Sequence, residues 1–321
     1  MRPLRGALLA GWLGTAGIAL LPICAASEGT LIEPERLLEQ MAQAQQQLEY
    51  EGTLVYLHGH HLATLRIARR IEHGVSKESL FSLSGPIRAV ARNERGVTCM
   101  LPDSRAFLVP RDPRQDTVLR IGPYDFERIR LFYRITALGA SRVAGRDTDV
   151  IGVVPKDELR YGHRFYIDRE TGLPLKIDLL STAGEPIEQV MFTSLDVIGT
   201  AKGELGQSLP PRESAGVPPI EPVSAPSNLP PGFSVVSAEQ QKEGGGILQH
   251  LLVSDGLASV SLYLEPAFDG ALDGATRMGS MTAVGRRVDD HQVTAIGEVP
   301  EQTARMLVDG FTARLTAASQ P

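Results

Sequence analysis

Apolar residues recur at every second position of this chain in one run after another, and turn residues separate the runs. In the segment 62–74, Leu65, Ile67 and Ile71 alternate with polar or small residues. This period is typical of a β-strand with one buried face and one wet face. Similar runs fill residues 141–197, with Gly, Pro or Asp at each junction. The pattern predicts a long antiparallel meander.

Three segments have helical spacing of their apolar residues. Residues 34–48 and 300–315 each carry an apolar stripe, and each begins with a proline, which suits the first helical position. Residues 125–138 are compatible with a short helix followed by a strand. Because strands outnumber helices, we expect an α+β protein that is mainly antiparallel β.

The N-terminus has the pattern of a secretory signal peptide. Arg2 and Arg5 precede an apolar run over residues 6–23, and small residues follow. We predict a signal peptide over residues 1–26, cleaved after Ala26, with cleavage after Ala25 as the alternative. A transmembrane anchor is the competing interpretation, but the run is short and rich in glycine.

The chain has 321 residues, which favours two domains. Residues 199–232 contain eight of the 22 prolines and little apolar periodicity, as in a linker or a loop over the surface. We therefore expect a large domain over 27–200, a Pro-rich linker over 201–228 and a small domain over 229–321.

The net charge of −6 gives no indication of a nucleic-acid partner. Removal of the signal peptide would leave Cys99 as the only cysteine, so the mature chain could form no internal disulfide.

Three carboxylates, Asp168, Glu170 and Asp178, lie within one short segment. The segment is predicted to be a β-hairpin with Gly172 in its turn, because glycine readily adopts a positive φ. Carboxylates at a hairpin tip are solvated and keep ordinary pKa values, whereas acid–base catalysis needs shifted ones. We therefore predict no catalytic residue and no enzyme activity. The alternative is a hydrolase that uses Asp168 or His163.

The remaining candidates are a histidine cluster and two arginine pairs. His58, His60 and His61 lie at a predicted hairpin tip, with His58 and His60 expected on one side. A metal site needs further fixed ligands, and none is nearby in sequence, so we predict neither metal nor cofactor. The arginine pairs at 69–70 and 286–287 suit either an exposed strand face or recognition of an acidic segment or lipid phosphate.

Three segments in this order, 160–176, 254–266 and 297–304, give the mature chain a resemblance to the RseB/MucB family of periplasmic negative regulators of an envelope-stress sigma factor. The resemblance implies a large unclosed β-barrel, similar to periplasmic lipoprotein carriers, with helices in its hollow. It implies a small β-sheet/helix domain that holds the periplasmic segment of a membrane anti-sigma factor (RseA/MucA-like). Holding this segment would shield it from site-1 proteolysis, and lipid or lipopolysaccharide would release it.

On this resemblance we expect two groups of site residues. The lipid-binding residues expected to line the hollow are Tyr56, Leu65, Ile67, Phe81 and Leu83. The partner-binding residues expected on the small domain are Ser254, Asp255, Gly256, Arg286 and Arg287. A periplasmic lipid or lipoprotein carrier is the alternative function, and self-association into a homo-oligomer stays open.

Overall fold

The structure is a computed structural model of the chain. It describes residues 33–72, 75–84, 89–93, 96–100, 106–109, 125–200, 226, 228–243 and 246–318. The predicted signal peptide and most of the predicted linker lie outside these residues, as does the side chain of Cys99. None of the described helices is both long enough and apolar enough to cross a membrane.

The larger of two sheets has eleven strands. In chain order they are β1 (Leu48–His58), β2 (His61–Glu72), β3 (Val75–Ser82), β4 (Ala89–Asn93), β5 (Gly96–Met100), β6 (Ala106–Val109), β7 (Tyr133–Val143), β8 (Arg146–Pro155), β9 (Gly162–Asp168), β10 (Pro174–Leu180) and β11 (Pro186–Thr200).

The strand order is β6-β5-β4-β3-β2-β1-β11-β10-β9-β8-β7, and all neighbours whose register is described run antiparallel. Every neighbouring pair is a sequential hairpin or connection except β1 with β11, which joins the two halves of the meander. Strands β6 and β7 form the two edges, so the sheet is not closed into a barrel. This confirms the prediction of a mainly antiparallel protein with a large unclosed sheet.

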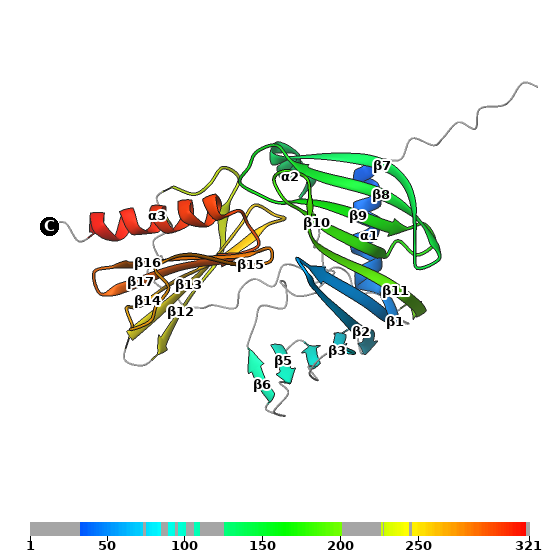
Figure 1. The fold of residues 1–321 in the computed structure, drawn as a ribbon, viewed down its shortest axis with the longest axis horizontal. Helices are drawn as coiled ribbons and strands as arrows, with labels where there is room; N and C mark the ends of the chain where they lie inside the picture. Colours follow the sequence, from blue (N-terminus) through cyan, green and yellow to red (C-terminus); the bar gives the residue numbers. More distant parts are fainter. Residues whose placement is uncertain are drawn as a thin grey trace, which may run out of the picture. The chain divides into compact units, whose positions relative to one another are not determined.

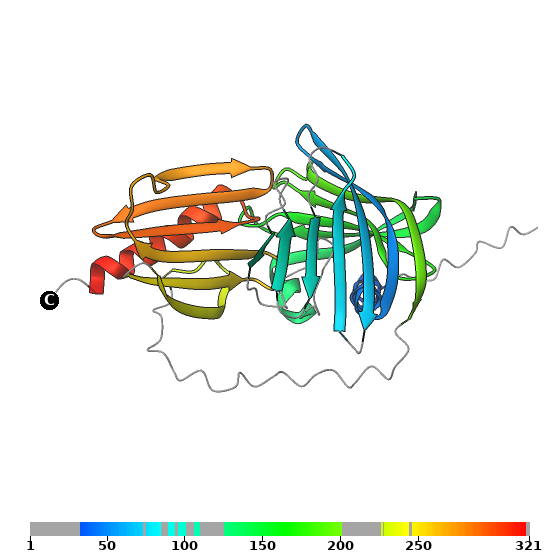
Figure 2. The same ribbon diagram turned by 90° about the horizontal axis from the view of Figure 1, so that it is seen from below.

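Two helices accompany this sheet, α1 (Pro34–Gln47) and α2 (Phe126–Phe132). Leu38 and Met41 of α1 and Ile129 of α2 are buried in one apolar cluster with residues of β7, β8 and β9. Figures 1 and 2 show α1 running along the concave side of the sheet. The predicted helix at 34–48 is therefore confirmed, and 125–138 contains both a short helix and the start of a strand.

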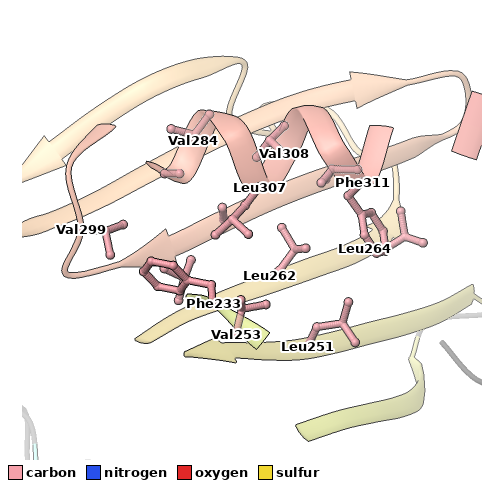
Figure 3. Packing of buried hydrophobic residues seen from close by; sticks show 14 of the residues in the cluster. Phe233, Leu251, Val253, Leu262, Leu264, Val284, Val299, Leu307, Val308 and Phe311 are labelled. Carbon is pink, nitrogen blue, oxygen red and sulfur yellow. The ribbon is translucent and has the colours of Figure 1, made fainter. Parts of the chain in front are cut away.

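The second sheet has six strands and carries the third helix. The elements are β12 (Ser234–Glu243), β13 (Gly246–Ser254), β14 (Ser259–Pro266), β15 (Gly274–Met278), β16 (Met281–Val288), β17 (His291–Gly297) and α3 (Glu301–Ala318). The strand order is β12-β13-β14-β17-β16-β15. Leu307, Val308 and Phe311 of α3 pack on Leu262 and other apolar residues of one sheet face (Figure 3).

Candidate functional site

A buried ion pair joins a loop of the 11-stranded sheet to a turn of the six-stranded sheet. Arg160, between β8 and β9, donates from Nη1 to Oδ2 of Asp255, between β13 and β14, at 2.7 Å. Both side chains are 0% exposed. Because an unpaired buried charge is strongly unfavourable, each residue depends on the other for its place in the fold.

Each carboxylate oxygen of Asp255 accepts two hydrogen bonds. Oδ1 accepts hydrogen bonds from the backbone N–H groups of Leu257 (2.9 Å) and Ala258 (2.7 Å). Oδ2 accepts one from the hydroxyl group of Tyr133, at 2.8 Å, besides the one from Arg160. Burial raises the pKa of Tyr133 and the Asp255 carboxylate raises it further, so the phenol stays a donor at neutral pH.

The guanidinium group of Arg160 is enclosed by aromatic rings and further acceptors. Its Cζ lies 4.8 Å from the ring centroid of Phe132 and 5.1 Å from that of Phe233, within cation–π range. Nε donates to Asp157 at 3.0 Å, and Nη2 donates to the carbonyl oxygen of Pro231 at 2.6 Å. This arrangement satisfies a buried charge with fixed partners and leaves it no role in binding a ligand.

Three of the predicted partner-binding residues form this turn. Ser254 is buried, and its hydroxyl group donates to the carbonyl oxygen of Ala258 at 2.8 Å. Asp255 holds Arg160, and Gly256 takes a positive φ of 102°. The turn itself was predicted correctly. The side chains of Ser254 and Asp255 are buried and satisfied inside the chain, and contact of this turn with a partner remains a prediction.

Arg286 and Arg287 lie on opposite faces of β16. Arg286 pairs with Asp309 of α3 at 2.5 Å, on the face that the helix covers. Arg287 donates to the carbonyl oxygen of Asp289 at 3.3 Å in the β16–β17 turn. Both are partly solvated, and the two guanidinium groups do not form one basic patch. Contact of either residue with a partner remains a prediction.

A second polar contact involves Glu188 of β11 and Ser280 in the β15–β16 turn. Oε1 of Glu188 accepts hydrogen bonds from the backbone N–H (3.1 Å) and the hydroxyl group (2.6 Å) of Ser280. A cavity of about 230 Å³ lies beside it, and Leu57, Ile187 and Arg277 are among the residues that line it.

The residues expected to line the hollow divide between the two faces of the large sheet. Tyr56, Leu65 and Ile67 lie with the buried apolar residues of β1, β2 and β3. Phe81 pairs with Arg66 across β2 and β3, whereas its neighbour Leu80 pairs with Ile67.

Phe81 therefore lies on the opposite face from Ile67, and its side chain is 47% exposed. Leu83, just beyond β3, is 57% exposed. The alternation of strands explains the correction for Phe81, because neighbouring positions face opposite sides. Lipid contact by Tyr56, Leu65 or Ile67 remains a prediction.

The three carboxylates at 168–178 lie in the predicted hairpin, but they are not all solvated. Asp168 is buried, and Arg146 donates to it at 2.8 Å. Burial opposes its ionisation, yet hydrogen bonds from Arg146 and Thr171 hold the pKa of Asp168 below its ordinary value. A carboxylate with a lowered pKa stays ionised at neutral pH and is poorly suited to act as a general acid.

The other two carboxylates have contrasting surroundings. Glu170 is exposed and shares Arg146 with Asp168. Asp178 is buried and accepts a hydrogen bond from Gln189 at 2.8 Å, with Lys176 at 3.1 Å. The expectation of a solvated carboxylate at the hairpin tip was therefore correct for Glu170 and wrong for Asp168. Their arginine and lysine partners were not foreseen.

The histidines do not form the arrangement expected from sequence. Gly59 and His60 form the turn, so His58 lies opposite His61, with ring centroids 5.8 Å apart. The expectation that His58 and His60 share a side was wrong, because the strand ends at His58. The described residues contain no group of three or more side chains arranged to hold a metal ion.

The residues that join the two sheets were not found by sequence reasoning. Arg160, Tyr133 and Glu188 carry no motif, and the partners of Arg160 in the other sheet region lie 71 and 95 positions away along the chain. Arg128 likewise donates to the carbonyl oxygen of Gly232 at 2.7 Å. The sequence analysis pointed toward this region through the segment 160–176, which begins at Arg160, and through the predicted partner-binding turn that contains Asp255.

The chain thus combines a meander sheet that has a helix on its concave side with a smaller unit of one sheet and one helix. The buried charges of Arg160 and Asp255 between them stabilise the structure. Comparison with known proteins places it more closely. The model of the MucB/RseB N-terminal domain matches residues 33–213, and that of the MucB/RseB C-terminal domain matches residues 224–312. The chain belongs to the MucB/RseB family.

Two relatives illustrate the similarity in sequence. The chain is 32% identical over 308 residues to the sigma factor AlgU regulatory protein MucB of Pseudomonas aeruginosa, covering 88% of this chain and 91% of the relative. It is 29% identical over 290 residues to the sigma-E factor regulatory protein RseB of Salmonella typhimurium, covering 87% and 90%.

Two solved structures show the similarity in fold. The complex of MucA and MucB from Pseudomonas aeruginosa matches with a TM-score of 0.64 at 28% identity, covering 86% of this chain and 97% of the other. A crystal structure of MucB in complex with MucA(peri) matches with a TM-score of 0.62 at 29% identity, with the same coverage.

Proposed function

We propose that this chain is a periplasmic negative regulator of the envelope stress response. It binds the periplasmic segment of a membrane anti-sigma factor and shields that segment from site-1 proteolysis. Lipid or lipopolysaccharide binds the regulator and releases the segment. The observation that carries the proposal is the match of nearly the whole folded chain to MucB, a sigma-factor regulatory protein solved in complex with MucA(peri).

The described structure supports binding rather than catalysis. Asp168, the carboxylate considered for a hydrolase, is held by Arg146, and the buried charge of Asp255 is likewise paired with Arg160. Partly buried apolar residues, among them Tyr56 and Leu65, pack against the buried apolar cluster on the concave side of the large sheet. A sheet of this kind suits an apolar ligand.

Release by lipid follows from linkage between two binding sites. A lipid can weaken segment binding only by the difference in its own affinity for the segment-bound and segment-free forms. Coupling of this kind typically amounts to about 1–3 kcal/mol, or roughly 5- to 150-fold in affinity. The segment must in turn weaken lipid binding by the same factor.

Calorimetric titration tests this proposal. The chain from residue 27 onward is titrated with the periplasmic segment of the anti-sigma factor encoded beside it, with and without lipopolysaccharide. Saturable binding that lipopolysaccharide weakens by at least about fivefold is the expected result. Absence of segment binding, with lipid still bound, would exclude a regulator and favour a carrier.

A further inference from the structure

Two carboxylates, one from each sheet region, approach a single hydroxyl group. Oγ of Ser280, in the β15–β16 turn, lies 2.6 Å from Oε1 of Glu188 on β11. It also lies 3.4 Å from Oε1 of Glu298, which directly follows β17. We call these three residues the Ser280 contact. Ser280 is fully buried, whereas Glu298 is exposed, so a proton can reach Glu298 from water.

The one hydroxyl hydrogen of Ser280 cannot serve both carboxylates. A serine hydroxyl group donates one hydrogen bond and can accept others. The shorter distance assigns its hydrogen to Glu188, which also accepts the backbone N–H of Ser280 at 3.1 Å. An ionised Glu298 then faces an oxygen that has no hydrogen left to donate. A protonated Glu298 carries its own hydrogen and can donate it to this oxygen.

The turn that carries Ser280 fits closely against the large sheet. Gly279 has a φ of 66°, and a Cβ at this position would clash with the ring of His58. His58 and Glu188 pair across β1 and β11, so the imidazole ring and the carboxylate lie on the same face, against the turn. Separation of the turn from the large sheet therefore breaks both hydrogen bonds from Ser280 to Glu188.

Both glutamates lack an arginine or lysine partner in the described part of the chain. Arg277 lines the neighbouring cavity, but its Nε donates to the carbonyl oxygen of Gly279 at 3.0 Å, and it forms no ion pair with Glu188 or Glu298. Tyr56 of β1 is hydrogen-bonded to Glu188. Burial, followed by the charge of Glu188, raises the pKa of Tyr56, so the phenol stays a neutral donor.

The remaining titratable groups are two histidines at the tip of the β1–β2 hairpin. The rings of His58 and His61 stack with their centroids 5.8 Å apart. Histidine gains a positive charge on acidification, and a positive charge beside Glu188 would reduce the repulsion between the two carboxylates. Protonation of His58 and protonation of Glu298 would thus act in the same direction, and the experiment has to separate them.

We propose that Glu188 and Glu298 form a proton-operated latch, in which acidification tightens the contact of the β15–β16 turn with the large sheet. Ionisation of Glu298 loosens the contact, because two negative charges then share one hydroxyl group. The buried pair of Arg160 and Asp255 keeps the two sheet regions joined when the latch is loose. The latch is a property of the chain alone and does not rest on the proposed function.

The proton affinity of Glu298 gives the direction of the effect. Burial of its carboxyl group, followed by the charge of Glu188, raises the pKa of Glu298, although the hydrogen bond with Ser280 acts against this. When the contact breaks, both causes are removed. The closed contact therefore binds the proton more tightly. Its extra stability is complete below about pH 4.5 and is lost as the pH rises through the raised pKa.

The test is hydrogen exchange of the Ser280 N–H, followed by nuclear magnetic resonance on the chain from residue 27 onward at several pH values from about 5 to 8. This N–H donates to Glu188, so its exchange reports opening of the contact. Dividing by the exchange rate of an unstructured peptide at each pH gives the protection of the N–H. Protection is expected to fall roughly two- to fivefold as the pH rises, the range for a partly exposed charge pair.

Glu298→Gln is expected to remove most of this pH dependence, because its amide is neutral at every pH and can donate to Ser280. Glu239→Gln is the matched control, since Glu239 is an exposed glutamate of β12, at an edge of the same sheet. It should leave the pH dependence unchanged. His58→Gln should retain a fall in protection with rising pH, carried by Glu298.

Three outcomes would overturn the inference. The first is a Glu298→Gln variant that keeps half or more of the pH dependence, or a His58→Gln variant that loses it. The second is a parallel fall at the N–H of Ala295, in the central strand β17, because this would report unfolding of the whole sheet. The third is constant or rising protection of Ser280 in the unchanged chain, which decides the matter even if a variant does not fold.

Discussion

The ion pair between Arg160 and Asp255 is predicted to be a major determinant of stability, and Asp255→Asn tests this. The substitution keeps an oxygen for the N–H groups of Leu257 and Ala258 but removes the negative charge. Arg160 would then stay fully buried, with Asp157 as its nearest carboxylate. Removing one partner of a buried pair costs about 3–5 kcal/mol, so the free energy of unfolding is expected to fall by about that amount.

Urea denaturation followed by far-ultraviolet circular dichroism measures this change. Circular dichroism is preferred to tryptophan fluorescence because Trp12, the only tryptophan, precedes residue 27. Arg305→Met is the control, since Arg305 forms an exposed ion pair with Glu301. Exposed pairs contribute about 0–1 kcal/mol.

A double-mutant cycle isolates the interaction. If the pair is coupled, Arg160→Met combined with Asp255→Leu destabilises the protein by less than the sum of the two single changes, because no buried charge is left alone. Single changes below about 1 kcal/mol, or a strictly additive double variant, would refute the reasoning.

Three further predictions concern single residues. An alanine at a left-handed position costs about 1–2 kcal/mol. Gly232→Ala is expected to lower the free energy of unfolding by more than this, because φ is 85° and a Cβ would also lie 2.6 Å from the Phe132 ring. Gly184→Ala, where φ is 81° but the space is open, should lower the melting temperature less than Gly232→Ala in a thermal scan. Burial outweighs the nearby Asp255 charge and lowers the pKa of His163 to about 4, so the unfolded chain binds the extra proton and stability falls as the pH drops from 6.5 towards 4. This contribution amounts to about 2 kcal/mol between pH 7 and 5, and a His163→Gln variant with the same pH profile in urea denaturation would contradict it. The lowered pKa of Asp168 stabilises the fold above about pH 3.9 and the gain is lost as the pH falls further, so acid unfolding curves of Asp168→Asn should be less steep below pH 4 than those of the unchanged chain.

Much of the fold could be predicted because it is encoded locally. The alternation in β2 and the turn glycine at 172 fix strands and hairpins within a few residues of themselves. Helices α1 and α3 likewise follow from their apolar stripes and from the prolines near their starts.

The site was harder to predict because its contacts are between residues far apart in sequence. The turn at 254–256 was identified, but the arginine that buries Asp255 comes from 95 positions earlier. Phe81 was expected in the hollow on the resemblance to the family, although its register with Arg66 places it on the opposite face from Ile67. The period of a sequence predicts which residues share a face of a strand. It does not predict which distant residue will pair with a given charged side chain.

The central claim, that this chain shields an anti-sigma segment until lipid arrives, is tested most directly by a protection assay. The purified periplasmic segment is incubated with its site-1 protease, with and without the chain from residue 27 onward, and cleavage is followed over time. The account predicts that the chain slows cleavage and that added lipopolysaccharide restores it. Cleavage at the same rate with and without the chain, under conditions where the two proteins bind, would contradict the account.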